Sequence, residues 1–208
     1  MTLPTGRVIN ADCLEVLRGL PDQSVDLILT DPPYGIGAGR EKPHNGWKDY
    51  GISDWDMKRP EKELFDEMRR VSKNQIIWGG NYFADYLPPS MGWLVWDKCQ
   101  REFSLADGEL AWTSFHRATR IFSYPRGTAL RDGKEHPTQK PLDLMAWCLR
   151  TTAVSEGAVV FDPYLGSGTT ALACEKMGIR WMGCEVNQDY AAIASRRIEA
   201  ERAQGKLF

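Results

Sequence analysis

The residues best suited to chemistry in this chain follow a short apolar run at residues 25–30 and read Asp31-Pro32-Pro33-Tyr34. The two prolines remove two N–H donors, so this loop presents mainly hydrogen-bond acceptors. The Asp31 carboxylate and the Pro32 carbonyl can together accept both hydrogens of an –NH₂ group, while the Tyr34 ring stacks on the planar group that carries it. A rigid turn that ends a strand is the purely structural interpretation, and the motif alone does not exclude it.

Such a loop suits the methylation of an amino nitrogen on a heterocyclic base. That nitrogen is a poor nucleophile, because its lone pair is delocalised into the ring. Acceptors that hold its two hydrogens out of plane localise the lone pair and stabilise the positive charge that develops on attack. The electrophile is then a sulfonium methyl group held in line, so positioning does most of the remaining work. Asp31 can accept or relay the surplus proton.

A second loop has the composition of a cofactor site. An apolar run at residues 158–161 leads into residues 162–171, in which Gly166, Gly168 and Ala171 have the G-x-G-x-x-G/A spacing. Glycines there let the backbone turn sharply and let a ligand approach it closely. The next apolar run ends at Glu185, whose carboxylate can accept both hydroxyl hydrogens of an adenosine ribose. We therefore expect an adenosine cofactor, and the lack of a lysine after the glycines argues against a P-loop.

These loops need a sheet to position them. Short apolar runs alternate with helical patterns, which predicts an α/β fold with a mainly parallel sheet covered by helices. The three strands expected between residues 93 and 123 have no helix between them and suggest an antiparallel meander at one edge. We expect strands at Arg7–Ala11, Val25–Thr30, Gln75–Trp78, Trp93–Trp96, Glu109–Ser114, Thr119–Ser123, Ala158–Phe161 and Trp181–Cys184, and helices at Leu14–Gly19, Glu61–Ser72, Leu142–Thr152, Thr169–Met177 and Gln188–Ala203.

Length and composition exclude several classes of protein. The 208 residues fit a single domain over residues 1–208, and 42% hydrophobic with 26% charged residues is ordinary for a soluble protein. No apolar run is long enough to span a bilayer or serve as a signal peptide, so we expect a cytoplasmic protein with no membrane partner. The five cysteines contain no CxxC pair and the histidines have no companions at metal-ligand spacing, so we assign no disulfide and no metal.

The net charge of −2 does not indicate nucleic-acid binding, but basic residues gather in one segment. From His116 to Lys140 there are six basic residues against two acidic ones. A local basic face can neutralise phosphates, although a solvated charged surface explains the same bias. From this excess we predict that DNA contacts come from Arg117, Arg120, Arg126 and Lys134.

Together, Asp31–Tyr34 and Phe161–Thr169 resemble the catalytic and cofactor motifs of the amino-directed DNA methyltransferases, which modify adenine N6 or cytosine N4. The catalytic motif precedes the glycine loop, an order similar to that of the circularly permuted β class. Residues 10–14 resemble the family's acidic strand end beside the cofactor adenine, and residues 136–141 resemble its segment over the methionine end. The resemblance implies the Rossmann-like fold of S-adenosylmethionine-dependent methyltransferases, with a seven-stranded sheet and one reversed strand.

The resemblance also implies a role for each matched residue. Asp31, Pro32, Pro33 and Tyr34 would act on a base flipped out of double-stranded DNA. Asp12 and Cys13 would contact the adenine of S-adenosylmethionine, Glu185 its ribose and Lys140 its methionine carboxylate. The rest of the cofactor site would be lined by Asp31, Phe161, Asp162, Gly166, Ser167, Gly168 and Thr169.

Asp in the first motif position is usual for adenine enzymes of this family and Ser for cytosine enzymes, so Asp31 predicts N6-methyladenine, with N4-methylcytosine as the alternative. Only the irregular segments 35–57 and 99–136 are available to face DNA. So small a region for recognising a DNA sequence agrees with three alternatives: a short recognition site, loose sequence specificity, or a partner subunit that contributes to recognition. The sequence leaves open a homodimer, a companion restriction enzyme, and whether the host is a bacterial or a phage-infected cell.

Three rival functions fit these residues less well. Amino-methyltransferases acting on RNA or on protein glutamine usually place the glycine loop before an Asn-Pro-Pro-Tyr motif, whereas this chain has Asp31 and the reverse order. Binding of a nicotinamide dinucleotide by the glycine loop leaves residues 31–34 unexplained. A catalytically silent DNA-binding protein is disfavoured because Asp31 and Glu185 are both present.

Overall fold

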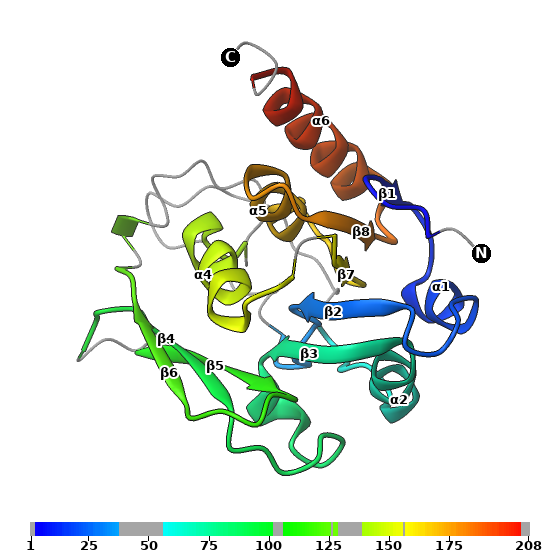
Figure 1. Ribbon diagram of the computed structural model, residues 1–208. Helices are drawn as coiled ribbons and strands as arrows, with labels where there is room; N and C mark the ends of the chain where they lie inside the picture. The colour runs from blue at the N-terminus through cyan, green and yellow to red at the C-terminus, as the bar shows by residue number, and fades with distance from the viewer. Residues whose placement is uncertain are drawn as a thin grey trace.

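The computed structural model describes residues 3–37, 56–101, 106–125, 127–128, 139–155 and 157–204. Its described strands form one eight-stranded sheet in the order β1-β8-β7-β2-β3-β5-β4-β6 (Figure 1). The strands are β1 (Val8–Ile9), β2 (Val25–Thr30), β3 (Ser72–Trp78), β4 (Trp93–Asp97), β5 (Gly108–Thr113), β6 (Arg120–Ser123), β7 (Val159–Asp162) and β8 (Arg180–Cys184). The helices are α1 (Cys13–Arg18), α2 (Lys62–Val71), the 3₁₀ helix η2 (Gly80–Phe83), α4 (Leu142–Thr152), α5 (Thr169–Lys176) and α6 (Gln188–Gln204).

The sheet is mainly parallel, as the sequence predicts. Among the described strands only β5 is reversed: it pairs antiparallel with β3 and β4, while all other pairs are parallel. The expected strands and helices are all present, each within three residues of its predicted bounds. The sheet has the eight strands that the residue patterns predict, one more than the seven that the resemblance implied, and the two-residue strand β1 forms its edge by pairing with β8.

The predicted meander is wrong in its order. β4 lies between β5 and β6, pairing antiparallel with the first and parallel with the second. The reason is that β5 inserts between β3 and β4, which leaves only the outer edge of β4 for β6. The connection from β5 to β6 therefore passes the start of β4 at Gly92, where a Cβ would lie 2.3 Å from the carbonyl oxygen of Phe115.

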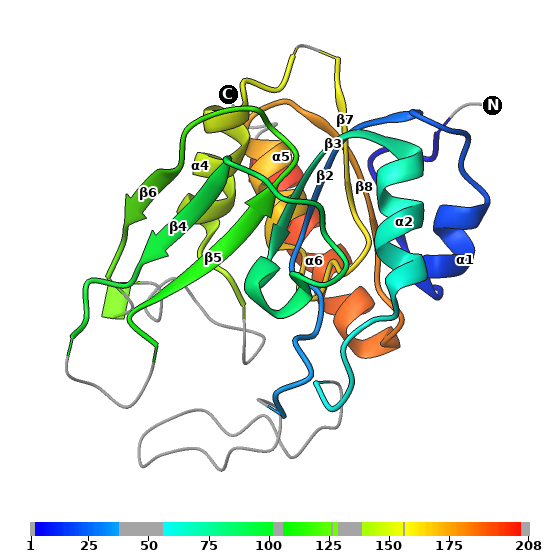
Figure 2. The same cartoon turned by 90° about the horizontal axis from the view of Figure 1, so that it is seen from below.

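Helices cover both faces of the sheet, which explains why its central strands read as continuous apolar runs. On one face Leu27 and Leu29 of β2 pack in a core with α4, α5 and α6. On the other face Ile28 packs with residues of α1, α2 and η2. Figures 1 and 2 show these two layers, with α4 and α5 on one side of β2 and α1 and α2 on the other.

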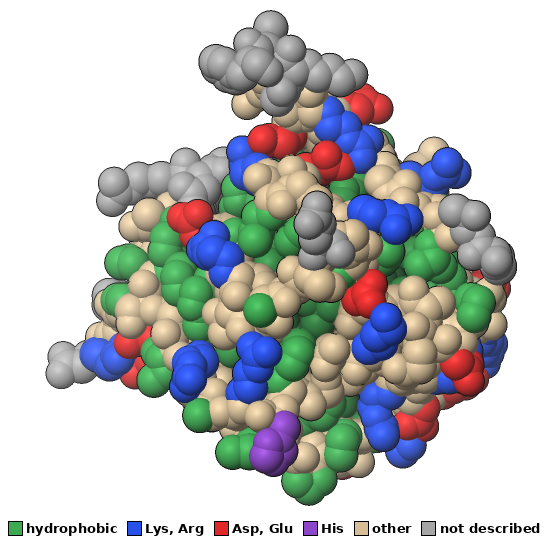
Figure 3. All heavy atoms as spheres, viewed as in Figure 1, with side chains coloured by type: hydrophobic (Ala, Val, Ile, Leu, Met, Phe, Trp, Pro, Cys, Tyr) green, Lys and Arg blue, Asp and Glu red, His purple; other side chains and the backbone are tan. Residues whose placement is uncertain are grey.

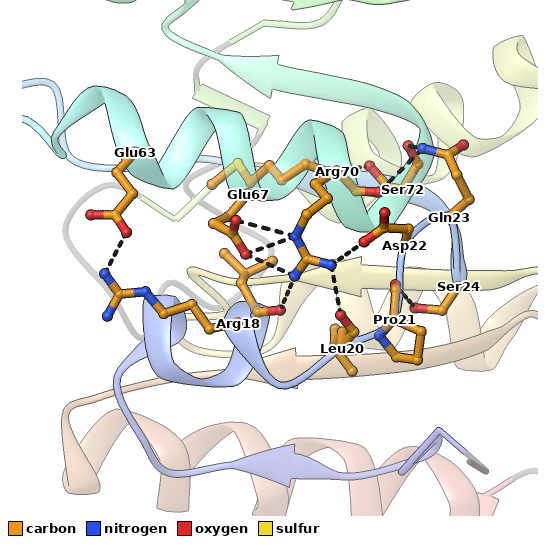
Figure 4. A network of polar contacts seen from close by, with 12 residues as sticks. Arg18, Leu20, Pro21, Asp22, Gln23, Ser24, Glu63, Glu67, Arg70 and Ser72 are labelled. Atoms are coloured by element: carbon orange, nitrogen blue, oxygen red, sulfur yellow. Dashed lines mark hydrogen bonds and ion pairs between the residues drawn. The ribbon is translucent and has the colours of Figure 1, made fainter.

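Arg70 on α2 fixes the connection that leads into β2 (Figure 4). Its guanidinium donates at 3.0 Å to the carbonyl oxygen of Leu17, in the last turn of α1, and at 2.9 Å to that of Leu20, two residues beyond the helix. It also pairs with Asp22 at 2.5 Å and Glu67 at 2.8 Å. The last carbonyls of a helix have no partner within the helix, so Arg70 both caps α1 and joins it to α2.

None of the helices in the described part of the chain is both long and apolar enough to cross a membrane.

The crossing at Gly92 gives a test of the strand order. Gly92→Ala should lower the free energy of unfolding by about 1–3 kcal/mol, because its Cβ would meet backbone that has to move. Urea denaturation measures the change. The matched control is Gly19→Ala, whose Cβ would meet its nearest atom at 3.5 Å, an ordinary contact. A Gly92→Ala protein as stable as the control protein would contradict the described crossing.

Candidate active site

The two loops of the predicted site meet at the carboxyl edge of the sheet. β2, β7 and β8 run parallel, so Asp31, Asp162 and Glu185 all lie at the ends of neighbouring strands. Ligands of open α/β sheets bind outside this edge. The loops are also linked directly, because the Thr30 hydroxyl donates to Asp162 Oδ1 at 2.8 Å.

Asp31 is held from two sides. Tyr34 Oη donates to its Oδ1 at 2.6 Å, and Lys140 Nζ donates to its Oδ2 at 2.5 Å. Burial raises the pKa of Asp31, and the Lys140 ammonium opposes that rise. A carboxylate has about four lone-pair positions, so each oxygen of Asp31 retains the capacity to accept one more hydrogen.

Lys140 belongs to a chain of four charges. Its side chain is only 5% exposed, and its ammonium also pairs with Glu109 Oε2 at 2.9 Å. Lys98 pairs with Glu109 Oε1 at 2.6 Å. Burial alone would raise the pKa of Glu109, but Lys140 and Lys98 lower it to about 2. Burial would lower the pKa of Lys140, but Asp31 and Glu109 raise it above its usual value. One buried ammonium therefore stands between two carboxyl groups, and a second lysine pairs with one of them.

The sequence analysis missed Glu109 and Lys98. The available signal is their position: Glu109 begins the expected strand Glu109–Ser114, and Lys98 comes two residues after the expected strand Trp93–Trp96. A charge at that position has to be paired when the sheet is covered on both faces.

The Tyr34 ring is also held in place. It stacks on Tyr82, with ring centroids 4.8 Å apart. Gly79 leaves the space for it, since a Cβ there would lie 2.1 Å from the ring. The buried Asp56 carboxylate accepts from the backbone N–H of Tyr34 at 2.6 Å and of Gly35 at 2.9 Å. The loop is thus preorganised, and the sequence gives no signal for Tyr82 or Asp56 beyond their residue types.

The glycine loop is built around Glu185. The Glu185 carboxylate accepts from the backbone N–H of Gly166 at 2.9 Å and of Asn187 at 2.8 Å. Gly166 has φ +53°, and no atom lies within 4 Å of the position of a Cβ, so a ligand can approach here. Gly168 serves packing instead, because its Cβ would lie 3.1 Å from Ala194 on α6.

Several other predicted cofactor residues support the loop rather than facing a ligand with their side chains. Phe161 is fully buried in the core, and Thr169 begins α5 as a buried residue. Asp162 accepts from Thr30, from the Tyr164 N–H at 3.0 Å and from the Thr170 hydroxyl at 2.6 Å. These contacts fasten the end of β7 to β2 and to α5.

The predicted adenine contacts lie where β1 leads into α1. Asp12 caps α1 by accepting from the N–H of Leu14 at 2.8 Å and of Glu15 at 3.3 Å, and its side chain is exposed. Cys13 is partly buried beside Tyr164, and burial raises its pKa to about 11. β1 lies next to β8, so these residues flank Glu185. An adenosine cofactor fits this arrangement, which combines the open space at Gly166, the carboxylate of Glu185 and the start of α1 beside them.

Ser167 joins the glycine loop to the segment before α4. Its hydroxyl donates to Gln139 Oε1 at 2.8 Å, and Arg197 on α6 donates to its carbonyl oxygen at 2.5 Å. Gln139 is the neighbour of Lys140, for which the resemblance implied a contact with the methionine carboxylate. The structure places the Lys140 ammonium on Asp31 and Glu109.

Two of the predicted DNA-binding residues lie away from this edge. Arg117 precedes β6 and donates to the carbonyl oxygen of Thr151 at the end of α4 at 2.7 Å, and Arg120 begins β6. β6 starts at the amino-terminal edge of the sheet, opposite Asp31. Figure 3 shows Lys and Arg side chains on one face, interspersed with acidic and apolar ones. Arg126 and Lys134 lie outside the described residues.

Comparison with known proteins agrees with this geometry. Residues 77–196 match the family described as DNA methylase, of the N6/N4 type. The type II methyltransferase M.HpaI of Haemophilus parainfluenzae is 25% identical over 94% of this chain and 74% of its own length. The crystal structure of an M1.HpyAVI–SAM complex has a TM-score of 0.58 at 23% identity, covering 92% of this chain and 98% of that one. The cytosine-N4-specific PvuII DNA methyltransferase has a TM-score of 0.62 at 17% identity, covering 96% and 92%.

Asp162 gives a pH-dependent test of the link between the two loops. Burial raises its pKa to about 6, against hydrogen bonds from Thr170 and Thr30. The folded protein therefore holds this proton more tightly than the unfolded chain, and the wild type gains stability as pH falls through 6. Between about pH 7.5 and 5 its stability relative to Asp162→Asn should rise by about 1 kcal/mol. Urea denaturation at both pH values measures this, and an equal difference at both would contradict it.

Proposed function

The chain belongs to the N6/N4 DNA methylase family, and on this premise we propose that it transfers a methyl group from S-adenosylmethionine to the N6 amino group of adenine in double-stranded DNA. The observation that carries the proposal is the preorganised Asp31, whose free lone pairs lie beside a glycine loop that fits an adenosine cofactor. S-adenosylmethionine is the cofactor bound in the similar M1.HpyAVI complex.

In the proposed reaction the target base is flipped out of the helix and reaches Asp31 at the carboxyl edge. The Asp31 carboxylate and the Pro32 carbonyl accept the two amino hydrogens, which localises the lone pair on the nitrogen. S-adenosylmethionine supplies the electrophilic methyl group: an N–C bond forms as the S–C bond breaks. The surplus proton leaves the nitrogen towards Asp31.

The remaining site residues position these groups. Glu185 would hold the ribose, Asp12 and Cys13 the adenine, and the backbone at Gly166, Ser167 and Gly168 the methionine end. Tyr34 would stack on the base, with Pro33 setting the direction of the loop. Lys140, which donates to Asp31 in the structure, would position that carboxyl group, and its contact with the methionine carboxylate stays a prediction.

The setting of the reaction is part of the proposal. DNA approaches over the carboxyl edge, because the target base has to reach Asp31. Similarity to the type II methyltransferase M.HpaI supports a role in restriction–modification, with a companion restriction enzyme as partner.

The two loops should have separable roles. Asp31→Ala should abolish methyl transfer while leaving S-adenosylmethionine binding nearly unchanged, because Asp31 touches the base. Glu185→Ala should weaken that binding by about 1–3 kcal/mol through lost hydrogen bonds. Transfer of tritiated methyl groups to PCR-amplified genomic DNA and calorimetric cofactor binding measure the two effects. The control is Glu199→Ala, an exposed carboxylate on α6. Near-normal turnover of Asp31→Ala would overturn the catalytic assignment.

The modified base is the second test. Adenine and cytosine both present an amino group beside a ring nitrogen, so two acceptors alone discriminate weakly; the preference rests on Asp31 in the first motif position. We expect N6-methyladenine as the main product, with some cytosine methylation at mismatched or single-stranded sites, where flipping costs less. Mass spectrometry of digested nucleosides decides this. Predominant N4-methylcytosine, the base named for the PvuII enzyme, would refute the adenine assignment and leave the roles of Asp31 and Tyr34 intact.

A further inference from the structure

We infer that Glu109 and Lys98 form a positioning pair for methyl transfer, which holds Lys140 against Asp31 and balances the charge around that carboxylate. The inference rests on the proposed function, because it takes Asp31 as the group that accepts the amino hydrogens. Neither Glu109 nor Lys98 belongs to the two motif loops.

The first argument is the geometry of the Lys140 ammonium. An ammonium has three N–H donors, and this one has three oxygens around it. They are Asp31 Oδ2 at 2.5 Å, Glu109 Oε2 at 2.9 Å and Tyr34 Oη at 3.2 Å. Tyr34 in turn donates to Asp31, which closes a ring of contacts. Glu109 is the partner that prevents the ammonium from swinging fully onto Asp31 and Tyr34.

The second argument is charge. Counted as formal charges, the two carboxylates of Asp31 and Glu109 balance the two ammonium groups of Lys140 and Lys98. The side chains of Asp31, Glu109, Lys98 and Lys140 are 19%, 22%, 11% and 5% exposed. Uncompensated charge at such burial is costly, so Lys140 alone would leave one carboxylate unbalanced. Lys98 supplies the missing charge from the segment that follows β4.

The third argument concerns the reversed strand. Because β5 runs antiparallel to its neighbours, its beginning rather than its end lies at the carboxyl edge. Glu109 is the second residue of β5, and it pairs with Trp96 near the end of β4. Lys98 follows β4 directly, and its N–H donates to the carbonyl oxygen of Asp107 at 2.9 Å. The reversal therefore brings a carboxylate to the site from a strand start.

Other titratable groups around Asp31 do not supply this balance. Asp162, at the end of β7, is another acidic group near Asp31 and so cannot offset its charge. Its oxygens accept hydrogen bonds from Thr30, Tyr164 and Thr170. Tyr34 ends the motif loop and stacks on Tyr82, and burial raises the pKa of Tyr34 well above its usual value. Cys148 on α4 faces Lys140, and burial raises its pKa too. The charges that offset one another are the two lysines and the two carboxylates.

A charge-balance cycle tests the inference: Glu109→Gln, Lys98→Gln and the double variant. Glu109→Gln removes a negative charge near Asp31, so its pKa should fall and the acid limb of the kcat profile should move to lower pH. Lys98→Gln removes the positive charge that offsets Glu109, so the pKa of Asp31 should rise and the acid limb of the kcat profile should move to higher pH. The double variant is neutral again, and its limb should return towards that of the wild type. Methyl transfer to PCR-amplified genomic DNA measures all four proteins.

Geometry is tested separately by comparing Glu109→Ala with Glu109→Gln. Alanine removes the acceptor for Lys140 and should lower kcat by roughly 100-fold, as expected when a catalytic group is misplaced. Glutamine keeps an acceptor oxygen and should restore much of kcat. The KM for S-adenosylmethionine should change by less than about twofold in both, because Glu109 does not touch the glycine loop. Glu201→Gln and Lys176→Gln, from an ion pair between α5 and α6, are the matched controls.

Outcomes separate this inference from the proposed function. If the wild type methylates DNA but the two single variants shift the limb in the same direction, or not at all, the pair is merely structural. If the wild type methylates no DNA, the proposed function fails. The titration of Asp31 can then be followed by NMR of protein labelled with ¹³C-carboxyl aspartate, with Asp31→Asn for assignment. Opposite shifts in the two variants would still support the charge balance, and unchanged titration would refute it.

Discussion

The site depends on one interaction, the buried ion pair between Asp31 and Lys140. Removing one partner of a buried pair costs about 3–5 kcal/mol, because it strands the other charge. The pair is tolerated because Glu109 forms a second ion pair with the ammonium and Tyr34 accepts a further hydrogen bond from it. The Lys140 ammonium opposes the rise in the pKa of Asp31 that burial causes, and the carboxyl group keeps lone pairs for an incoming amino group. The stability of the loop and its chemistry thus rest on the same contacts.

The sheet positions that pair by the directions of its strands. β2 and β7 are parallel, so Asp31 and Asp162 leave the sheet at the same edge, and the Thr30 hydroxyl joins them. β5 is reversed, so it delivers Glu109 to that edge from its first residues. A parallel strand at this place would begin at the opposite edge. The reversed strand is therefore a structural requirement of the charge cluster, and the crossing at Gly92 is its consequence.

Sequence patterns predict the local elements well and the long-range pairing less well. The period of apolar residues marks each helix and strand, and the spacing from Gly166 to Ala171 marks the glycine loop, because both signals lie within a few residues. The order β5-β4-β6 depends on which strand pairs with the open edge of the sheet, and no pattern within a few residues of sequence predicts that pairing. Glu109 and Lys98 were missed for the same reason: they are 11 residues apart in sequence, and their partner Lys140 comes from another segment. For Lys140 the resemblance implied a contact with the methionine carboxylate, which stays a prediction, and no sequence signal indicated the two carboxylates that the fold brings to its ammonium.

The two halves of the site are joined mechanically. Arg197 on α6 holds the carbonyl oxygen of Ser167, the Ser167 hydroxyl donates to Gln139, and Gln139 is followed by Lys140. The glycine loop and the ammonium on Asp31 are thus connected through one side-chain contact and one peptide bond. A shift of Ser167 has to be absorbed between Gln139 and Lys140, where the Lys140 side chain is almost fully buried and has three partners. With so little freedom at that end, the Lys140 ammonium is held from the side of the glycine loop as well as by its own partners.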